Sequence, residues 1–318
     1  MRVHAVPAGR TLRPKTKLQK ALNSVRRNWL LYVFLIPAIA YIAAFHYAPM
    51  YGLQIAFRKF KIKDGFSGSK WVGLDWFERF FDSPRFWTIL ENTLAVSIYS
   101  LIVNFILPII LAFVLNNIRT KFFKKFSQTI TYMPHFISTV VLVGMMSVLF
   151  DPRSGLVNTM LGWFGVEPIY FMGESQYFRD MYVWSGVWQG IGWGSIIYMA
   201  ALAGVDPTLH EAAMIDGASK LKRIWHIDIP AILPTISIML IMSFGKVMSV
   251  GYEKVYLMQN ALNLQVSEVI STYVYKMGII NHQYSYSAAI GLFNNVINFI
   301  LVVTMNKVVK KLSGSGLW

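Results

Sequence analysis

One polar segment interrupts a strongly apolar sequence at positions 206–230. It reads Asp206-Pro207-Thr208-Leu209-His210-Glu211-Ala212-Ala213-Met214-Ile215-Asp216-Gly217-Ala218 and continues to Ile227-Asp228-Ile229-Pro230. Asp206 and Pro207 form a helix start, because aspartate is a preferred N-cap and proline fits the first helical position. We therefore predict a short amphipathic helix over Thr208–Ile215. Gly217 stands where a C-cap glycine belongs, and a second short helix is predicted over about Ser219–Ile227.

The rest of the chain is unusually apolar. Of its 318 residues, 55% are hydrophobic and only 14% are charged, and its mean hydropathy is +0.46. Soluble domains average about 25% charged residues, so lipid is the main solvent predicted for this chain. The sequence contains no cysteine, which excludes a disulfide framework or a thiolate metal site.

Six apolar stretches are each long enough for a spanning helix, which needs about 20 residues. They are Trp29–Ala48, Trp87–Leu115, Thr129–Phe150, Met181–Val205, Ala231–Tyr252 and Tyr284–Met305. No signal-peptide cleavage site follows the basic start of the chain, so the first stretch is interpreted as a retained span. We predict an all-α membrane protein with a six-helix domain over 29–306, a basic segment at 1–28 and a tail at 307–318.

The net charge of +15 reflects topology. If the N-terminus is cytoplasmic, the inner segments hold 18 basic residues and four acidic residues. The outer loops then hold 11 basic residues and ten acidic residues. Basic residues are retained on the cytoplasmic side, so both termini are predicted to lie inside. The first outer loop is an exception, because it contains the basic residues Arg58, Lys59, Lys61 and Lys63. The excess of basic residues on the inner side remains. Arginine and aromatic residues are not interleaved as on a nucleic-acid surface, so no nucleic-acid partner is expected.

The spacing within 206–230 resembles the EAA loop of ABC importer permeases. In that family the loop forms a coupling helix that docks into a cleft on the ATPase subunit. The resemblance implies that Ile227 and Pro230 support the loop, and Ile229 stands where leucine is usual. It assigns the coupling contact to Glu211, Ala212, Ala213, Met214, Asp216, Gly217 and Ala218.

Other stretches extend the resemblance over about 29–305, to the polysaccharide-fragment subgroup of binding-protein-dependent sugar permeases (LplB-type and MalF-like, including alginate-type importers). They are Glu91-Asn92-Thr93-Leu94, Tyr132–Ser138, Gly192-Trp193-Gly194-Ser195, Gln283–Tyr286 and Ala289–Phe293. The resemblance implies a type I permease fold in the bacterial inner membrane, working by alternating access. It implies two ATPase subunits, a second, different permease subunit and an extracytoplasmic solute-binding protein. ATP and magnesium would be bound by the ATPase subunits, and this chain would hold no cofactor.

Candidate residues of the substrate path are Lys246, Asn104 and Asn295. A lysine in mid-span costs about 2.5–3.5 kcal/mol on insertion scales, so Lys246 is expected to face water or protein. Two interpretations stand at this point: it lines the path of an acidic, alginate-like oligosaccharide, or it pairs with a neighbouring helix. Neutral glycans and peptide-like solutes are the alternative cargoes. The glycines at 186, 190 and 194 predict close packing of the fourth span, within the chain or against the second permease.

Two other classes of protein are disfavoured. An ion-coupled secondary transporter is expected to carry intramembrane acids or inverted repeats, and the predicted spans contain almost no acids. An enzyme needs a catalytic or nucleotide-binding cluster, and the sequence has no P-loop or zinc-protease motif. The outer loops Asp151–Tyr177 and Glu253–Asn281 are the expected contacts of the solute-binding protein.

Overall fold

The computed structural model describes residues 26–314 and 316–318. The chain divides into two compact units, Met1–Gln54 and Ile55–Trp318. Almost all of the basic segment predicted at 1–28 lies outside the described residues.

The described part of the first unit is helical. It comprises α2 (Trp29–Ile42), the π-helical turn η1 (Ala43–Tyr47) and the start of the 3-10 helix η2 (Ala48–Phe57). Together they form a candidate membrane span, Trp29–Phe57, that is longer than the predicted one. No residue of α2 is buried. A helix that is apolar all round is suited to lipid or to another membrane helix.

The second unit is helical apart from a two-stranded ribbon. Its elements are β1 (Arg58–Lys59), α3 (Gly65–Gly68), β2 (Lys70–Trp71), α4 (Asp75–Phe81), α5 (Phe86–Asn116), α6 (Lys121–Tyr132), η3 (Met133–Phe136), α7 (Thr139–Leu149), α8 (Leu156–Gly162), α9 (Ser175–Leu202), α10 (Pro207–Ile215), α11 (Lys220–Arg223), η4 (Ile224–Asp228), α12 (Ile229–Phe244), α13 (Tyr252–Met258), α14 (Leu264–Ser267), α15 (Ile270–Tyr275), η5 (Lys276–Ile280) and α16 (Tyr284–Ser313). The ribbon is antiparallel.

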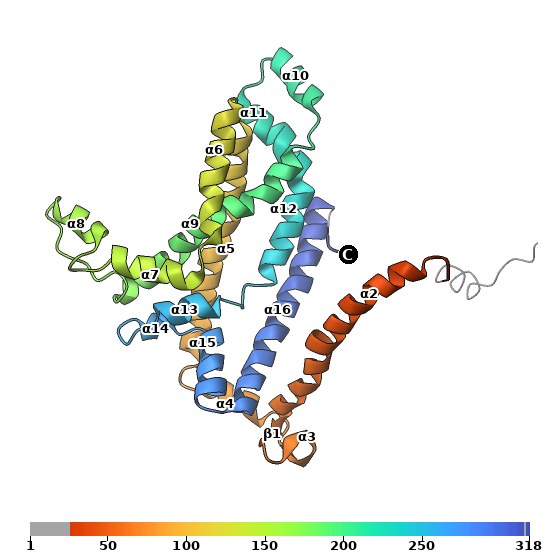
Figure 1. Cartoon of the computed structure of the whole chain (residues 1–318), viewed down its shortest axis with the longest axis vertical. Helices are drawn as coiled ribbons and strands as arrows, with labels where there is room; N and C mark the ends of the chain where they lie inside the picture. The colour runs from red at the N-terminus through yellow and green to blue at the C-terminus, as the bar shows by residue number, and fades with distance from the viewer. Residues whose placement is uncertain (1–25, 315) are drawn as a thin grey trace, which may run out of the picture. The chain divides into compact units, whose positions relative to one another are not determined.

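Long helices form a bundle in this unit. Helix α5 packs along α9, and α12 packs along α16. Helices α10 and α11 lie at one end of the bundle, and α4 and α15 lie at the other (Figure 1). Near the α10 end, α5, α9 and α12 share a small apolar core that includes Ala112, Tyr198 and Ile232.

The glycines of α9 allow close packing inside the chain. A Cβ atom added at Gly194 would lie 3.2 Å from Cγ of Pro108 on α5, and one at Gly186 would lie 4.0 Å from Oδ1 of Asn104. A side chain at Gly192 would overlap the carbonyl group of Thr131 on α6. Of the three glycines in the predicted spacing, Gly194 therefore makes the close approach to α5, and nothing lies within 4 Å of a Cβ atom added at Gly190.

The candidate spans differ from the predicted set. Four helices are long and apolar enough to cross a membrane, as judged over the described residues: Trp29–Phe57, Phe86–Asn116, Lys220–Phe244 and Tyr284–Ser313. The third predicted span is instead a broken one, with Lys121–Phe136 and Thr139–Leu149 bent by 99°. The break coincides with Pro134 and with Ser138, whose hydroxyl caps α7. Helix α9 is long enough, but its tryptophan, glycine and polar residues make it less apolar.

Two local predictions need correction. The second short helix, predicted over about Ser219–Ile227, is present as α11 and η4, but it runs on into α12 as one helix over Lys220–Phe244. Lys246 does not lie in the middle of a span, because α12 ends at Phe244 and the chain turns there. Both errors arise from placing the fifth helix about ten residues too late, since it begins in the polar segment.

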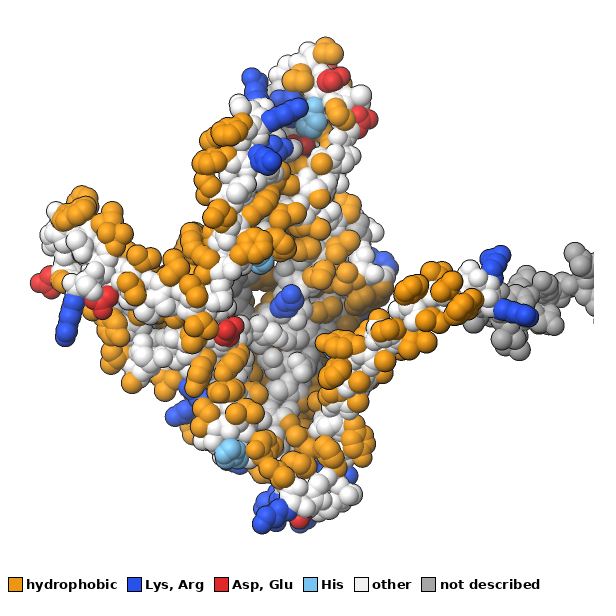
Figure 2. Space-filling view, viewed as in Figure 1, with side chains coloured by type: hydrophobic (Ala, Val, Ile, Leu, Met, Phe, Trp, Pro, Cys, Tyr) orange, Lys and Arg blue, Asp and Glu red, His pale blue; other side chains and the backbone are white. Residues whose placement is uncertain are grey.

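Apolar side chains cover much of the outside of the bundle (Figure 2). They include Trp87, Ile102 and Val114 of α5 and Phe299 of α16. A soluble monomer rarely exposes so continuous an apolar surface. This surface is suited to a bilayer.

Candidate functional site

The polar segment 206–230 forms the capped helix that its sequence predicts. The side chain of Asp206 accepts a hydrogen bond from the backbone N–H of Thr208 at 2.9 Å, and Pro207 occupies the first turn of α10. This hydrogen bond stabilises the charged carboxylate and lowers the pKa of Asp206. The start of α10 is thereby fixed without help from the rest of the bundle.

The end of α10 is fixed equally well. Gly217 adopts a positive φ of 74°, which costs a residue with a Cβ atom more than it costs glycine. Its N–H donates to the Met214 carbonyl at 3.1 Å, and the Ala218 N–H donates to the Ala213 carbonyl at 2.8 Å. These two bonds make a Schellman motif, which closes the free carbonyls of the last turn. The segment therefore presents a rigid helix rather than a flexible loop.

Helix α10 exposes apolar side chains. Ile215 is 88% exposed, and Leu209 and Met214 are also exposed. Glu211 and Ala212 lie on the surface as well. No residue of α10 is buried. A short helix of this kind at the end of a bundle is suited to contact another protein.

A contact between His210 and Asp228, which the sequence does not predict, joins α10 to the long helix behind it. Nε2 of His210 lies 3.1 Å from Oδ1 of Asp228, and the Asp228 side chain is only 5% exposed. Asp228 is the last residue of η4, which runs directly into α12. Helix α10 is thereby in contact with the start of a candidate membrane span, Lys220–Phe244. The only sequence signal was an aspartate placed beside the Ile229-Pro230 pair.

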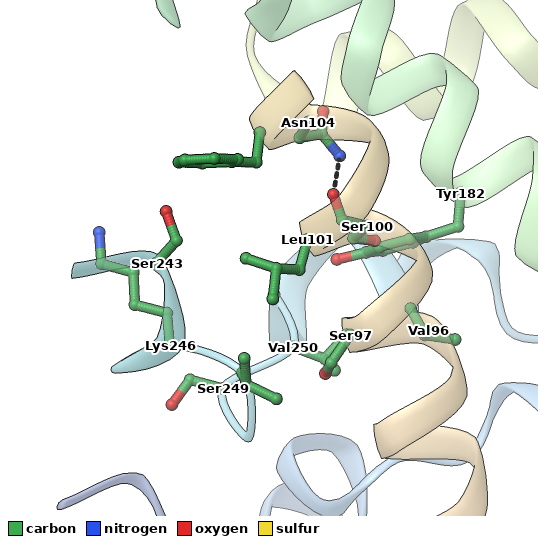
Figure 3. Close-up of a pocket in the computed structure, with 13 residues that line it drawn as sticks. Val96, Ser97, Ser100, Leu101, Asn104, Tyr182, Ser243, Lys246, Ser249 and Val250 are labelled. Carbon is green, nitrogen blue, oxygen red and sulfur yellow. Dashed lines mark hydrogen bonds between the residues drawn. The ribbon is translucent and has the colours of Figure 1, made fainter. Parts of the chain in front are cut away.

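A cavity of about 230 Å³ lies between α5, α9 and the turn that follows α12 (Figure 3). Lys246 and Ser243 lie on one side of it, and Asn104, Ser100 and Ser97 come from α5. The hydroxyl oxygens of Ser97 and Ser100 are buried and have no hydrogen-bond partner within the described chain. Unpaired buried hydroxyl groups are costly, so the cavity is suited to a ligand or water that supplies partners.

The cavity brings two of the three predicted path residues together. Asn104 donates to the Ser100 carbonyl at 2.9 Å, and Lys246 is exposed in the turn after α12. Asn295 is exposed on α16 and is not among the residues that line this cavity. Its neighbour Asn298 is buried and supports the turn, since its Oδ1 accepts the Met248 N–H at 3.0 Å.

Comparison with known proteins identifies the family. The model of the binding-protein-dependent transport system inner membrane component matches residues 104–314. The chain belongs to this family. Over 96% of its length it is 41% identical to a Bacillus subtilis protein described as a polygalacturonan/rhamnogalacturonan transport system permease, YteP, of which 95% is covered. It is also 41% identical to Protein LplB of the same organism, over 93% of each chain.

A solved structure is similar over nearly the whole permease. It is a chain of a bacterial alginate ABC transporter in complex with an alginate pentasaccharide-bound periplasmic protein. The identity is 35% and the TM-score 0.87, covering 94% of this chain and 100% of that one. The permease is thus a multi-pass membrane component of an ABC transporter and is not itself the catalytic subunit. This confirms the resemblance inferred from the EAA-like spacing and excludes the ion-coupled carrier.

The permease holds a second lysine near the cavity that sequence analysis missed. Nζ of Lys254, on α13, donates to the Tyr182 carbonyl at 2.8 Å and lies 4.8 Å from the centroid of the Tyr182 ring. It would lie 3.3 Å from a Cβ atom at Gly186, so that glycine makes room for it. Burial lowers the pKa of Lys254 to about 8. The sequence gives no sign of this packing, because Lys254 stands in a predicted outer loop beside the acidic residue Glu253.

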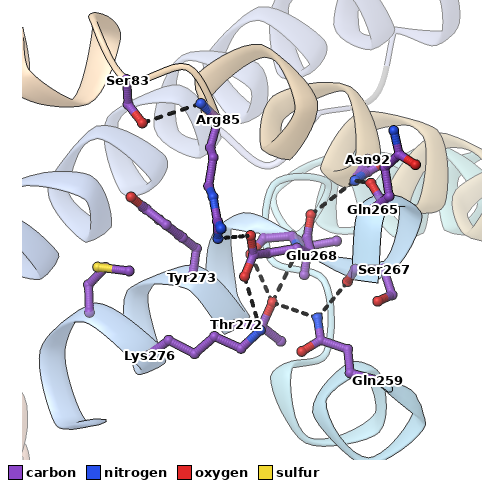
Figure 4. Close-up of polar contacts among 12 residues, drawn as sticks. Ser83, Arg85, Asn92, Gln259, Gln265, Ser267, Glu268, Thr272, Tyr273 and Lys276 are labelled. Atoms are coloured by element: carbon purple, nitrogen blue, oxygen red, sulfur yellow. Dashed lines mark hydrogen bonds and ion pairs between the residues drawn. The ribbon is translucent and has the colours of Figure 1, made fainter. Parts of the chain in front are cut away.

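Buried polar contacts hold the segment 252–280 of the permease to α5 (Figure 4). Nδ2 of Asn92 donates to the carbonyls of Gln265 at 2.8 Å and Glu268 at 3.2 Å. Thr93 accepts the Ile270 N–H at 2.9 Å. The buried carboxylate of Glu268 pairs with Arg85 at 3.1 Å and with Lys276 at 3.0 Å. These contacts explain why the Asn92-Thr93 pair stands near the start of α5.

The bend between α6 and α7 is held by two of the quoted stretches. The His135 ring stacks on the Trp193 ring with centroids 4.4 Å apart. Gln189 donates to the Ile137 carbonyl at 2.7 Å. The role of His135 is therefore packing at the bend.

A larger cavity of about 450 Å³ lies between α7 and α9. Its lining is almost entirely apolar, with Met145, Phe171 and Trp184 among the side chains and Asp180 as an acidic group at its edge. Tyr99 donates to Asp180 at 2.8 Å and accepts from Trp184 at 3.0 Å. Such a lining suits a lipid chain or a helix better than a polar solute.

Proposed function

We propose that this chain is one of two permease subunits in an ATP-driven importer of oligosaccharides, which transports its cargo by alternating access. The observation that carries the proposal is α10: a rigidly capped helix with exposed apolar residues, tied through His210 and Asp228 to a candidate span. ATP binding would bring the coupling helices of the two permeases together. Since a ligand shifts an equilibrium only through different affinities for two states, ATP and loaded binding protein must both favour the outward-open form.

The coupling contact is proposed to consist of Glu211, Ala212, Ala213, Met214, Asp216, Gly217 and Ala218. Glu211 would supply a charge, the alanines a small face that lets the helix approach closely, and Met214 an apolar anchor. Gly217 would keep the helix end in place. Two ATPase subunits, which bind ATP and magnesium, are the proposed partners at this surface.

Six spans with both termini cytoplasmic are the proposed topology. The four apolar helices would be joined by the bent pair α6–α7 and by α9. Helix α9 has 28 residues, or about 42 Å at 1.5 Å per residue, and a hydrocarbon core is about 30 Å thick. The proposed membrane domain is 29–306, with 1–28 and 307–318 in the cytoplasm of a bacterial cell. Helix α16 continues past this boundary to Ser313.

An acidic oligosaccharide is the proposed cargo. The cavity combines a lysine, an asparagine and unpaired serine hydroxyl groups, and Lys254 lies next to it. Hydroxyl and amide groups suit the hydroxyls of a sugar, and the lysines suit a carboxylate. The proteins similar to this chain include transporters named for polygalacturonan and for alginate. Asn295 is retained as a path residue that would act with the second permease, and a neutral glycan is the alternative cargo.

A second, different permease subunit and an extracytoplasmic solute-binding protein complete the proposed complex. The binding protein would dock on the loops Asp151–Tyr177 and Glu253–Asn281. The second of these loops is held on α5 by Asn92, Thr93 and Glu268, so docking there would reach the helix that lines the cavity.

The test is ATP hydrolysis by the reconstituted complex with its binding protein, in the presence of uronate or neutral oligosaccharides. We expect uronate oligosaccharides to stimulate hydrolysis and Glu211→Arg to abolish the stimulation, while Glu211→Gln, which keeps the size of the side chain, retains part of it. Unchanged stimulation in Glu211→Arg would refute the coupling contact. Stimulation by neutral sugars alone would refute only the acidic cargo.

A further inference from the structure

The ribbon formed by β1 and β2 carries a dense group of lysines. Residues 58–70 contain five basic residues and a single acid, Asp64. Lys and Arg side chains gather at the lower end of the space-filling view, where β1 and α3 lie in Figure 1 (Figure 2). The exposed lysines of this ribbon are Lys59, Lys61, Lys63 and Lys70. We refer to these four residues as the lysine group.

Within residues 26–314, the lysine group has no acidic partner in an ion pair. Lys59 and Lys70 also stand directly opposite each other in the antiparallel register. Like charges in this position destabilise a strand pair. An anion bound between them would remove that repulsion.

The ribbon is rigid enough to hold this arrangement. Nη1 of Arg58 donates to the carbonyls of Phe66 at 2.8 Å and Ser69 at 3.0 Å, so Arg58 is used to close the loop. The Ser69 hydroxyl accepts the Lys61 N–H at 3.1 Å. The Phe60 N–H donates to the Ser285 hydroxyl at 2.9 Å, which fixes the ribbon to the start of α16. The lysines are thus presented by an ordered surface.

Apolar side chains lie among the lysines. Ile62 is 71% exposed and Trp71 is 58% exposed. The ribbon directly follows the candidate span that ends at Phe57, and Ser285 is the second residue of another candidate span. The ribbon therefore follows one candidate span along the chain and is held at the start of another. Lysine beside exposed tryptophan and aliphatic residues is the composition of segments that lie in the headgroup region.

We propose that this ribbon binds anionic phospholipid headgroups on the face of the membrane opposite α10. A phosphodiester group between Lys59 and Lys70 would neutralise the cross-strand pair, while Ile62 and Trp71 enter the boundary between headgroups and acyl chains. An acidic oligosaccharide would match the charge but would leave Ile62 exposed. The proposal explains why basic residues occur in a loop where topology disfavours them, and it does not depend on the cargo.

The experiment uses the full transporter complex in nanodiscs. Because this chain contains no cysteine, Ser67→Cys on α3 gives it a unique labelling site beside the lysine group, with the other subunits made cysteine-free. A fluorophore at position 67 is quenched by lipids with brominated acyl chains, either phosphatidylglycerol or phosphatidylcholine in otherwise identical discs. The lysine group is changed to glutamine in one variant and to arginine, which keeps the charge, in a matched control.

We expect brominated phosphatidylglycerol to quench at least about threefold more strongly than brominated phosphatidylcholine, since each lysine near an anionic surface contributes roughly fivefold in affinity. The preference should vanish in the glutamine variant and persist in the arginine variant. Equal quenching by the two lipids in the unmodified ribbon would overturn the proposal. So would a fluorophore that no brominated lipid quenches but that responds to a uronate oligosaccharide, which would assign the ribbon to sugar binding.

Discussion

Helix α10 and the segment 252–280 differ in how they use their residues. Helix α10 buries no residue and keeps its shape through its own caps. The segment 252–280 buries polar groups such as Glu268 and Thr272 and is fastened to α5 through Asn92 and Thr93. The first presents exposed side chains, and the second is held in place by buried contacts. A substitution should therefore affect coupling in the first region and stability in the second.

The largest expected effect is that of Ile215→Glu in α10. The side chain is almost fully exposed, so the folded chain gains or loses little from the change. Ile215 lies between Met214 and Asp216 of the proposed coupling contact, so a carboxylate at position 215 would be desolvated without a partner when α10 docks on the ATPase subunit. Loss of a side chain that is buried at the centre of an interface typically costs about 2–4 kcal/mol of binding free energy. Transport and stimulated ATP hydrolysis should therefore fall at least about thirtyfold. The melting temperature of the complex in detergent should change little.

The matched control is Ile215→Leu, which keeps an apolar side chain of the same volume and should retain most of the transport activity. If Ile215→Glu transports normally, the contact made by α10 does not include its C-terminal end. A large drop in melting temperature would instead show that the chain itself packs against Ile215.

The second prediction concerns the partly buried Lys254 in the segment 252–280. Burial lowers its pKa to about 8, from about 10.4 for a lysine in an unfolded chain. Between these two values the unfolded chain binds more protons than the folded one, so the free energy of unfolding rises with pH. Below about pH 8 both states are protonated and the cost of burying the charge is present in full. Over the whole window the gain is about 3 kcal/mol, at about 1.36 kcal/mol per pKa unit.

The measurement is unfolding of the purified complex in detergent between pH 7 and 10.5. Lys254→Met should raise the stability at pH 7 and abolish the rise contributed by this residue. Lys246→Met is the control, because it removes a lysine that is exposed in the turn after α12. An identical pH profile in the unmodified complex and in Lys254→Met would mean that Lys254 is solvated.

The sequence was most informative where the chain acts locally. Asp206, Pro207 and Gly217 occupy positions that depend on the neighbouring residues alone, and α10 begins and ends as they predict. The apolar runs predicted the long helices for the same reason, since length and composition are local properties. The spacing of the alanines and Gly217 carried the family resemblance.

The sequence was least informative where contacts join distant segments. The pairing of His210 with Asp228, and of Thr93 with Ile270, cannot be read from either partner alone. Hydropathy placed Lys246 inside a helix because it does not register where a helix turns. The candidate site was therefore only partly predicted: Lys246 and Asn104 meet at one cavity, while Lys254 became visible only when α13 was seen packed on α9.

The smallest expected effect comes from a threonine-to-valine substitution, which we compare in the two regions. Thr93 is fully buried, and its hydroxyl accepts the Ile270 N–H and donates to the Ile89 carbonyl. Thr93→Val keeps the shape but leaves the Ile270 N–H without a partner, which costs about 1–3 kcal/mol. Thr208→Val in α10 should cost less than about 0.5 kcal/mol, because Thr208 is exposed and water replaces its contacts. Both values are measured by unfolding in detergent. Equal losses of unfolding free energy at the two positions would show that the segment 252–280 is no more firmly fastened to α5 than α10 is to its surroundings. The distinction between the two regions would then be wrong.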